Sequence, residues 1–396
     1  MINKIKSLAN SISDEVIDIR RHLHTYPELS FQEFETSKFI EDKLLSYGIN
    51  QISRCAENGI VAIISGKNPE KNCIALRADM DALPILEQND VPYRSVNDGV
   101  MHACGHDMHT SSLLGVAKIL NLTKDDWEGT IKLIFQPAEE KLPGGASIMI
   151  HEGVLENPKP SLIIGQHVHP PLETGKIGIK SGVYMASADE IYVTVKGKGG
   201  HGALPQDCVD PILVSAHIIT ALQQIVSRNA NPTIPSVLTF GKINSTGGAT
   251  NVIPNEVKID GTFRTFDEEW RFSAHKKMKK MASLMAESMG ATCDFDIIVG
   301  YPVLKNDEHV SEKVRSYAKE FIGESNVVDL PIRMTAEDFA YYSHKIPAAF
   351  YRIGTGNKEK NTHHALHTPT FNIDEDAIPT SIGLMSYLAI AMLGEF

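Results

Sequence analysis

Short apolar runs recur along the chain and alternate with segments in which apolar residues repeat at helical spacing. The runs are rich in β-branched residues, which favours buried strands. Five strands are predicted in this way: 59–65, 73–76, 130–135, 162–168 and 348–353. Helices are predicted over 13–47 with a break at Tyr26–Pro27, from His106 onward, over 307–321, from Thr335 onward, and over 382–393. This alternation predicts an α/β domain with a central mixed, mostly parallel sheet flanked by helices.

The middle of the chain, residues 183–298, follows a different pattern. Apolar and polar residues alternate at 191–195, 237–243 and 256–266, and two helical segments lie between predicted strands. The first of these helices is predicted to begin at Pro211, with Asp210 as its cap. The resulting strand–helix–strand–strand–helix–strand order is ferredoxin-like. We therefore expect 183–298 to be an inserted α+β domain, which leaves 1–182 and 299–396 as one discontinuous domain.

Composition and charge exclude several classes of partner. The chain has 396 residues, 42% of them hydrophobic, and a net charge of −11 with no basic run. Nucleic acid and an anionic membrane surface are therefore not expected as partners. The five cysteines are scattered and predict no disulfide framework. The first residues lack the apolar core of a signal peptide, and 382–393 is short for a bilayer of about 30 Å, so we expect a cytoplasmic protein.

Potential metal-binding side chains are most concentrated in the segment MHACGHDMHT, which begins at Met101. Three histidines, one cysteine and one aspartate fall within the eight positions from His102 to His109. Imidazole, thiolate and carboxylate are the side chains that bind divalent transition metals. The segment is thus predicted to be a metal-binding loop that leads into a buried helix. The alternative is a solvated turn in which Cys104 serves only core packing.

Further candidate ligands follow other predicted strands. Asp79 and Asp81 come after the run at 73–76, and Glu139 with Glu140 after the run at 130–135. His167 ends the run at 162–168, and three histidines lie between 363 and 367. Ligand sites in open α/β sheets form at the carboxyl ends of strands. Ligands collected from across a chain indicate a catalytic centre more than a structural zinc site, although each acidic pair alone could be a solvated turn.

These segments resemble a known family over nearly the whole chain. The resemblance rests on RRHLHTYPELSFQE, RADMDALP, HACGHDMHT, QPAEE, GQHVHP, GKGGHGALP, TNVIPNEVKIDGTFR, TAEDFAYY and LHTPTF, in that order. They resemble the N-acyl amino acid amidohydrolases of the metal-dependent aminoacylase and carboxypeptidase superfamily. The branch concerned includes hippurate hydrolase, the auxin-amino-acid hydrolases and N-acetyl-diaminopimelate deacetylase. The resemblance makes 1–182 with 299–396 the metal-binding catalytic domain, and 183–298 a lid and dimerisation domain.

The resemblance also implies a site that holds two divalent metal ions, manganese or zinc first and cobalt or nickel as alternatives. Carried over by position, the ligands are Cys104, His106, Glu140, His167 and His367. Glu139 becomes the general base and then the acid, and Cys104 the bridging ligand. Many superfamily members carry His-x-Asp where this chain has Asp79-Met80-Asp81. That departure makes Asp81 a supporting residue of the catalytic site and leaves the role of Asp79 open.

In the inserted domain, the resemblance implies that His201, Asn251 and Arg264 face the substrate. His201 would polarise the carbonyl group, and the other two would hold a free carboxylate. The implied substrate is a small N-acyl amino acid, and the implied assembly is a homodimer through the inserted domain. A dipeptidase or carboxypeptidase using the same centre is the alternative activity, and a non-catalytic metal-binding protein is a second alternative. Five further histidines compete for ligand roles, and His169 could replace His167: His102, His109, His169, His363 and His364.

Overall fold

The computed structural model describes residues 1–395, which form two compact units. The first unit contains Met1–Tyr184, Lys305–Pro331 and the chain from Asp338. The second unit contains Met185–Leu304 and the short segment Ile332–Glu337. This short segment lies within the range that the sequence assigned to the first domain. Each unit has its own hydrophobic core.

The first unit is built on an eight-stranded sheet whose strand order is β1-β2-β4-β3-β5-β16-β6-β15. Its four central strands, which run parallel, are β4 (Thr130–Gln136), β3 (Cys73–Asp79), β5 (Ile163–Glu173) and β16 (Ala348–Gly356). The outer strands are β1 (Ile52–Cys55), β2 (Gly59–Ser65), β6 (Ile177–Ile179) and β15 (Val327–Asp329). β2 runs antiparallel to β4, and β6 antiparallel to β16. The expected mixed, mostly parallel sheet is confirmed, and its strands β3 and β4 are fully buried, as continuous apolar runs require.

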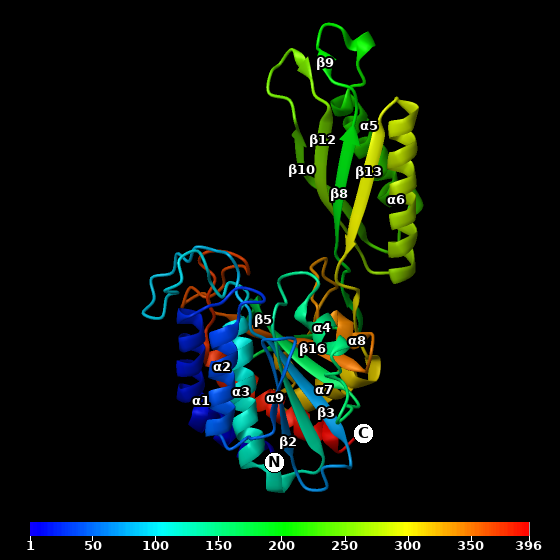
Figure 1. Ribbon diagram of the computed structural model, residues 1–396. Coiled ribbons are helices and arrows are strands. Elements are labelled where there is room, and N and C mark those ends of the chain that lie inside the picture. The colour runs from blue at the N-terminus through cyan, green and yellow to red at the C-terminus, as the bar shows by residue number, and fades with distance from the viewer. Residues whose placement is uncertain (396) are drawn as a thin grey trace. The chain divides into compact units, whose positions relative to one another are not determined.

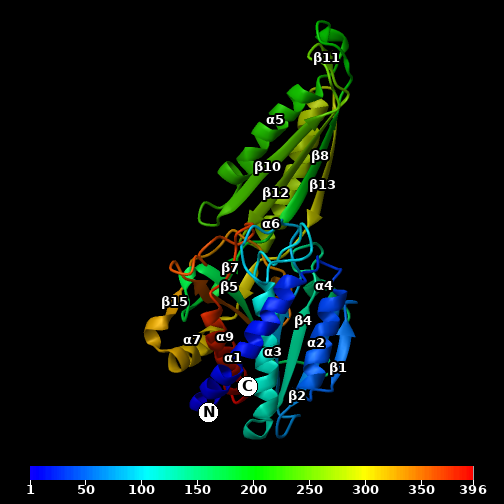
Figure 2. The ribbon, with the colours of Figure 1, turned by 90° about the vertical axis from the view of Figure 1, so that its left-hand side faces the viewer.

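Helices cover this sheet. α3 (His106–Leu122) and α9 (Ile378–Leu393) contact β3, and α1 (Ile2–Thr25) packs on both of them. Figures 1 and 2 show α1, α3 and α9 side by side, with α2 (Phe34–Ser46) next to them over β2. The remaining helices are α4 (Gly145–His151), α7 (Glu308–Ile322) and α8 (Ala340–Ser343). In Figure 1, α4 and α8 lie across the sheet from α3.

Two helix predictions were wrong at their boundaries. The first helix begins at Ile2, well before residue 13, because Ile5, Ala9 and Ile12 extend its buried face toward the N-terminus. The helix expected from Thr335 begins only at Ala340 and is four residues long. The carboxylate of Asp338 accounts for this second difference. It accepts hydrogen bonds from buried groups elsewhere in the first unit and does not cap a helix.

The apolar segment near the C-terminus is longer than the sequence suggested. The turn Glu375–Ala377 and α9 together give 19 residues, Glu375–Leu393, with the length and composition of a membrane span. The structure buries 72% of the apolar window of this segment inside the protein. Leu384, Leu388 and Met392 are fully buried in the core that also contains residues of α1 and α3. We therefore describe α9 as a core helix.

The second unit contains one antiparallel sheet of four strands in the order β10-β12-β8-β13. The strands are β8 (Asp189–Lys196), β10 (Ser236–Ser245), β12 (Glu256–Thr265) and β13 (Thr292–Val299). α5 (Pro211–Gln224) and α6 (Glu268–Ser288) pack on each other and on the sheet, as Figures 1 and 2 show. The order along the chain is the predicted strand–helix–strand–strand–helix–strand. The short strands β9 (Gly200–His201) and β11 (Val252–Ile253) form a separate two-stranded sheet in this unit. Where the chain passes between the two units, β7 (Gly182–Met185) pairs with β14 (Leu304–Asn306).

Candidate metal centre and active site

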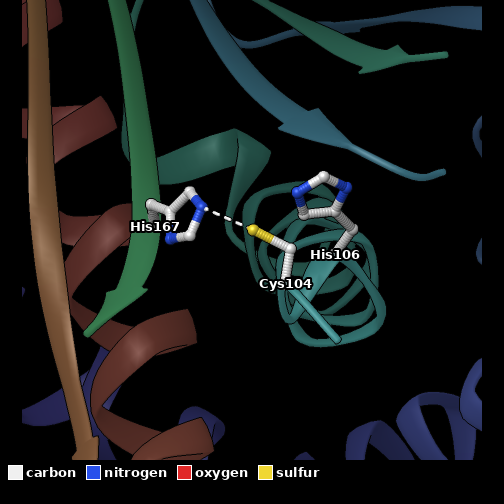
Figure 3. A group of neighbouring side chains, drawn as sticks. All are labelled: Cys104, His106 and His167. Atoms are coloured by element: carbon white, nitrogen blue, oxygen red, sulfur yellow. Dashed lines mark hydrogen bonds between the residues drawn. The ribbon is translucent and has the colours of Figure 1, made fainter. Parts of the chain in front are cut away.

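The turn before α3 arranges the first two candidate ligands. Gly105 has φ +83°, a left-handed conformation that glycine adopts without strain. It separates Cys104 from His106, the first residue of α3. Figure 3 shows the Cys104 sulfur directed toward the ring of His167, which comes from β5, with His106 on the other side of the cysteine. The sequence spacing therefore yields a turn followed by a helix start, as predicted.

All five predicted ligands converge in the first unit. Cys104 Sγ lies 3.4 Å from His167 Nε2 and 3.4 Å from His367 Nε2. Oε1 of Glu140 lies 3.1 Å from His367 Nε2 and 4.0 Å from His106 Nε2. Among the five predicted ligands, two groups of three have all their ligand atoms within 4.8 Å of one another, and Cys104 belongs to both: Cys104, His106 and His167; Cys104, Glu140 and His367. A shared thiolate between two groups suits a pair of ions.

The hydrogen bonds leave the correct atoms available for metal ions. His106 Nδ1 donates to Asp81 Oδ1 at 3.1 Å, and His167 Nδ1 donates to the Val168 carbonyl at 2.8 Å. In the neutral imidazole the proton is then on Nδ1, and Nε2 is the nitrogen that can bind a metal ion. Within residues 1–395, His106 Nε2 is buried and has no hydrogen-bond partner. Such atoms are costly when buried unless a ligand satisfies them, so the donor set fits divalent cations.

The charge of the site favours cations as well. Burial opposes protonation of His106, but Asp79, Asp81 and Glu140 outweigh it and raise its pKa to about 10. Burial raises the pKa of the Cys104 thiol, and the carboxylates of Glu140 and Glu139 raise it further. The shift of His106, and the part of the Cys104 shift that the carboxylates cause, record a buried excess of negative charge. A bound dication would offset that excess and favour the thiolate.

Glu139 is the buried carboxylate adjacent to this cluster. Ala138, at φ +51°, turns the chain after β4, so that Glu139 and Glu140 follow in a tight bend. Glu139 Oε1 accepts the backbone N–H of Asp338 at 3.3 Å. Its carboxylate oxygen also lies within 4.8 Å of ligand atoms of His106 and Glu140. A carboxylate with one oxygen fixed by an amide beside the metal ligands is suited to hold and move a proton.

Arg77 and Gln136, to which the sequence motifs assigned no role, support Glu139 through Asp338. Arg77 is buried and donates to Asp79 Oδ2 at 2.6 Å and to Asp338 Oδ1 at 2.7 Å. Gln136 Nε2 donates to Asp338 Oδ2 at 2.7 Å, and the Ala146 N–H donates to the same oxygen at 3.0 Å. The Asp338 main chain, which contacts Glu139, is thereby fixed. Arg77 stands in RADMDALP and Asp338 in TAEDFAYY, but nothing in either motif shows that they pair.

The competing histidines include one beside the cluster, since Asp79, His106 and His109 also have ligand atoms within 4.8 Å of one another. His109 uses both ring nitrogens in hydrogen bonds, and His364 Nδ1 lies 2.5 Å from Thr370 Oγ1. His102 is buried, and within residues 1–395 neither of its ring nitrogens has a hydrogen-bond partner. His167 faces Cys104, with Nε2 3.4 Å from Sγ. Asp79 lies 3.8 Å from His106 Nε2 and is held by Arg77 and His109.

The three candidates in the second unit do not all lie together. His201 is paired with Val252 in the β9–β11 ladder, and the Gly202 N–H donates to Asn251 O at 2.7 Å, so His201 and Asn251 share one exposed loop region. Arg264 lies at the other end of β12, where its Nη1 donates to Met334 O at 3.0 Å. Along β12, the eight residues from Glu256 to Arg264 span roughly 26 Å. Burial lowers the pKa of Arg264.

Imidazole, thiolate and carboxylate donors beside a further carboxylate that can act as a base are typical of metal-dependent hydrolases. The chain belongs to Peptidase family M20/M25/M40, whose model matches residues 75–391. The family predicted from the motifs is thus confirmed.

Named relatives and a solved structure agree with this membership. The chain is 43% identical to N-acetyl-L-cysteine deacetylase of Bacillus subtilis over 370 residues, which cover 93% of this chain and 86% of the relative. It is 45% identical to N-acyl-L-amino acid amidohydrolase of Geobacillus stearothermophilus over 306 residues, 77% of this chain and 82% of the relative. A crystal structure from Bacillus subtilis, a dinuclear metal binding peptidase from the M20 family, matches with a TM-score of 0.81 and 35% identity, covering 98% of this chain and 100% of that one.

Proposed function

We propose that the protein hydrolyses the amide bond of N-acyl amino acids with Glu139 as general base and acid. The observation that carries this proposal is the buried Glu139 carboxylate, fixed by the Asp338 N–H and adjacent to convergent ligand atoms of His106 and Glu140. The names of the two relatives, a deacetylase and an amidohydrolase of N-acyl amino acids, support the substrate class.

The residues of the centre have separate tasks. Cys104, His106, Glu140, His167 and His367 would hold two divalent ions. Such ions lower the pKa of water to about 7 and stabilise negative charge on a carbonyl oxygen. Glu139 accepts the proton of the attacking water and delivers it to the amine nitrogen that leaves. Glu139 can make this transfer because the amide of Asp338 holds one of its oxygens in place.

The ligand types narrow the choice of metal. Thiolate and imidazole favour zinc by affinity, while manganese, cobalt and nickel can fill the same site when they are more available. We propose zinc or manganese as the native ions. His367 has a side chain that is 53% exposed, which would leave the ions open to water and substrate on that side.

Substrate contacts are proposed from the second unit. His201 would donate to the carbonyl oxygen, while Asn251 and Arg264 would hold the carboxylate of the amino acid. Within one chain, Arg264 lies about a strand's length, roughly 26 Å, from the loop of His201 and Asn251. One small substrate cannot contact both ends. We therefore propose a homodimer through the second unit, in which His201 and Asn251 serve the partner's site.

A substrate panel tests the reaction. Full-length protein loaded separately with zinc, manganese or cobalt would be incubated with N-acetyl, N-benzoyl and longer N-acyl amino acids and with dipeptides, and released amino acid measured. We expect hydrolysis of N-acyl amino acids and a loss of about 10²–10⁴-fold in kcat for Glu139→Gln, with metal content unchanged. Cleavage of dipeptides alone would instead identify a peptidase, and an active Glu139→Gln would disprove the role of this carboxylate.

Subunit mixing tests the proposed dimer. Inactive Glu139→Gln and His201→Ala variants would be unfolded and refolded together, and their activity compared with each variant refolded alone. Exchange of His201 between subunits predicts that the mixture recovers activity, because one of the two sites in each mixed dimer has both residues intact. A monomeric mass by light scattering, or a mixture as inactive as its parts, would reject the shared site.

A further inference from the structure

The main chain of Val168 lies where two strands of the sheet separate. β5 pairs with β3 only from Ala75 opposite Ile163 to Arg77 opposite Gly165. On this edge the Leu162 carbonyl accepts from the Ala75 N–H, so even-numbered residues of β5 direct their main-chain groups toward β3. Val168 is even-numbered and lies three residues beyond the last pair. Its N–H and C=O are therefore directed to a place where β3 supplies no partner.

Two histidine side chains take the place of the missing strand. The Val168 N–H donates to His109 Nε2 at 2.9 Å, and the Val168 carbonyl accepts from His167 Nδ1 at 2.8 Å. All three residues are buried. The Val168 carbonyl sets the tautomer and direction of the His167 ring. The N–H of the same residue is held by His109, a residue of α3.

Asp79 fixes the state of His109. His109 Nδ1 donates to Asp79 Oδ1 at 2.5 Å, and the other oxygen of Asp79 accepts from Arg77 at 2.6 Å. A carboxylate partner at Nδ1 requires the proton there, so Nε2 is left as an acceptor. With Nε2 already used by Val168, His109 has no lone pair for a metal ion. This accounts both for a histidine that does not ligate and for the aspartate whose role the sequence left open.

We propose that His109, oriented by Asp79, is a positioning residue for the metal ligand His167. The chain of contacts runs from Arg77 through Asp79 and His109 to the Val168 main chain, and from there to the His167 ring. Partners that orient a ligating histidine change metal affinity by about 10–100-fold when removed. The inference rests on the metal centre of the proposed function, and it concerns metal affinity at one end of that centre.

Two substitutions at position 109 separate the two hydrogen bonds. In His109→Gln, the amide oxygen can occupy the place of Nε2 and accept from Val168, but the contact with Asp79 is lost. In His109→Asn, the amide nitrogen can occupy the place of Nδ1 and donate to Asp79, but the acceptor for Val168 is lost. The full-length variants would be freed of metal by chelation and titrated with Zn²⁺ against a competing chelator. His167→Ala and Glu140→Ala identify which of the two binding events belongs to each group of three ligands.

The expected result is selective. His109→Asn should weaken the event assigned by His167→Ala by about 10–100-fold and leave the event assigned by Glu140→Ala unchanged. His109→Gln should recover most of the loss. Equal weakening of both events, no weakening, or identical behaviour of the two variants would overturn the proposal. If neither variant folds, judged by thermal melting, Asp79→Asn decides. An amide nitrogen facing Nδ1 would reverse the His109 tautomer, and the same single event should weaken.

Failure of the underlying metal centre would look different. If Glu140→Ala and His167→Ala leave both binding events unchanged, then the ligand assignment is wrong. If those two variants behave as assigned and His109→Asn does not, only the positioning role of His109 is wrong.

Discussion

The carboxylate of Asp338 lies 2.7 Å from Nη2 of Arg77, and both side chains are completely buried. Breaking a buried ion pair by removal of one partner costs about 3–5 kcal/mol. We therefore expect Asp338→Ala to lower the free energy of unfolding by that amount, measured by urea denaturation of the metal-loaded protein. Its kcat should fall as well, because the main chain of Asp338 holds Glu139.

The exposed pair Lys4–Asp126 provides a control for this prediction. Its side chains are 53% and 36% exposed, and such surface pairs contribute about 0–1 kcal/mol. Lys4→Ala should therefore leave stability and kcat nearly unchanged. Equal effects of Lys4→Ala and Asp338→Ala would contradict the special role assigned to the buried pair.

Asp81 connects two of the metal ligands. Its Oδ1 accepts from His106 Nδ1 at 3.1 Å, and its Oδ2 accepts the Glu140 N–H at 3.0 Å and the Ser30 hydroxyl at 2.6 Å. Asp81→Asn keeps the shape but weakens these bonds, so metal affinity should fall by about 10–100-fold. Competition titration with a chelator measures this. Ser30→Ala removes only the hydrogen bond from Ser30, which is not a metal ligand, and should lower metal affinity less. A larger loss for Ser30→Ala than for Asp81→Asn would contradict this order.

Gly105 should tolerate no side chain. At φ +83°, an L-residue is strained by about 1–2 kcal/mol, and a Cβ would lie 2.5 Å from Val168 Cγ2. Gly105→Ala is therefore expected to lower both stability and metal affinity. Gly99 is the matched control, because it has φ +74° and a Cβ added there would meet no heavy atom of residues 1–395 within 4 Å. Thermal melting measures the stability of the two variants, and metal titration measures their metal affinity. If Gly105→Ala lowers neither quantity more than Gly99→Ala does, the contact with Val168 has no effect.

His24 should make stability depend on pH. It is buried, with Nδ1 2.8 Å from Asp107 Oδ2 and Nε2 3.0 Å from Glu87 Oε1, while Arg20 Nη2 lies 3.3 Å from Nδ1. Burial and Arg20 oppose protonation, but the two carboxylates outweigh them and raise the pKa of His24. A raised folded-state pKa gives stability that is complete below the unfolded value of about 6.5 and is lost as pH rises through the folded value.

The measurement compares wild type with His24→Gln by urea denaturation from about pH 5.5 to about pH 9. The stability difference between them should be largest at the acidic end and shrink as pH rises. A difference that is constant across this range, or that grows toward alkaline pH, would show that His24 is not held as a cation.

Much of the fold could be predicted from the sequence because local pattern and tertiary burial agree there. The run 59–65 is β2 at the predicted boundaries, and the run 130–135 is β4 with one more residue at its end. Asp210 caps α5 as expected and accepts from the Ile212 N–H. The failure at Thr335 has the opposite cause. A sequence that starts a helix in isolation was overridden by the buried partners of Asp338, which lie far away along the chain.

The sequence by itself determined the elements, the ligand types and the family, because side-chain chemistry and hydrophobic spacing are local properties. Only the tertiary structure showed which nitrogen of each histidine is available, because hydrogen-bond partners such as Asp81 and Val168 are set by the packing of separate segments. For the same reason it alone showed that both ring nitrogens of His109 are used, by Asp79 and by the Val168 N–H. It also separated Arg264 from His201, since the length of β12 lies between them, whereas the sequence placed both at one substrate.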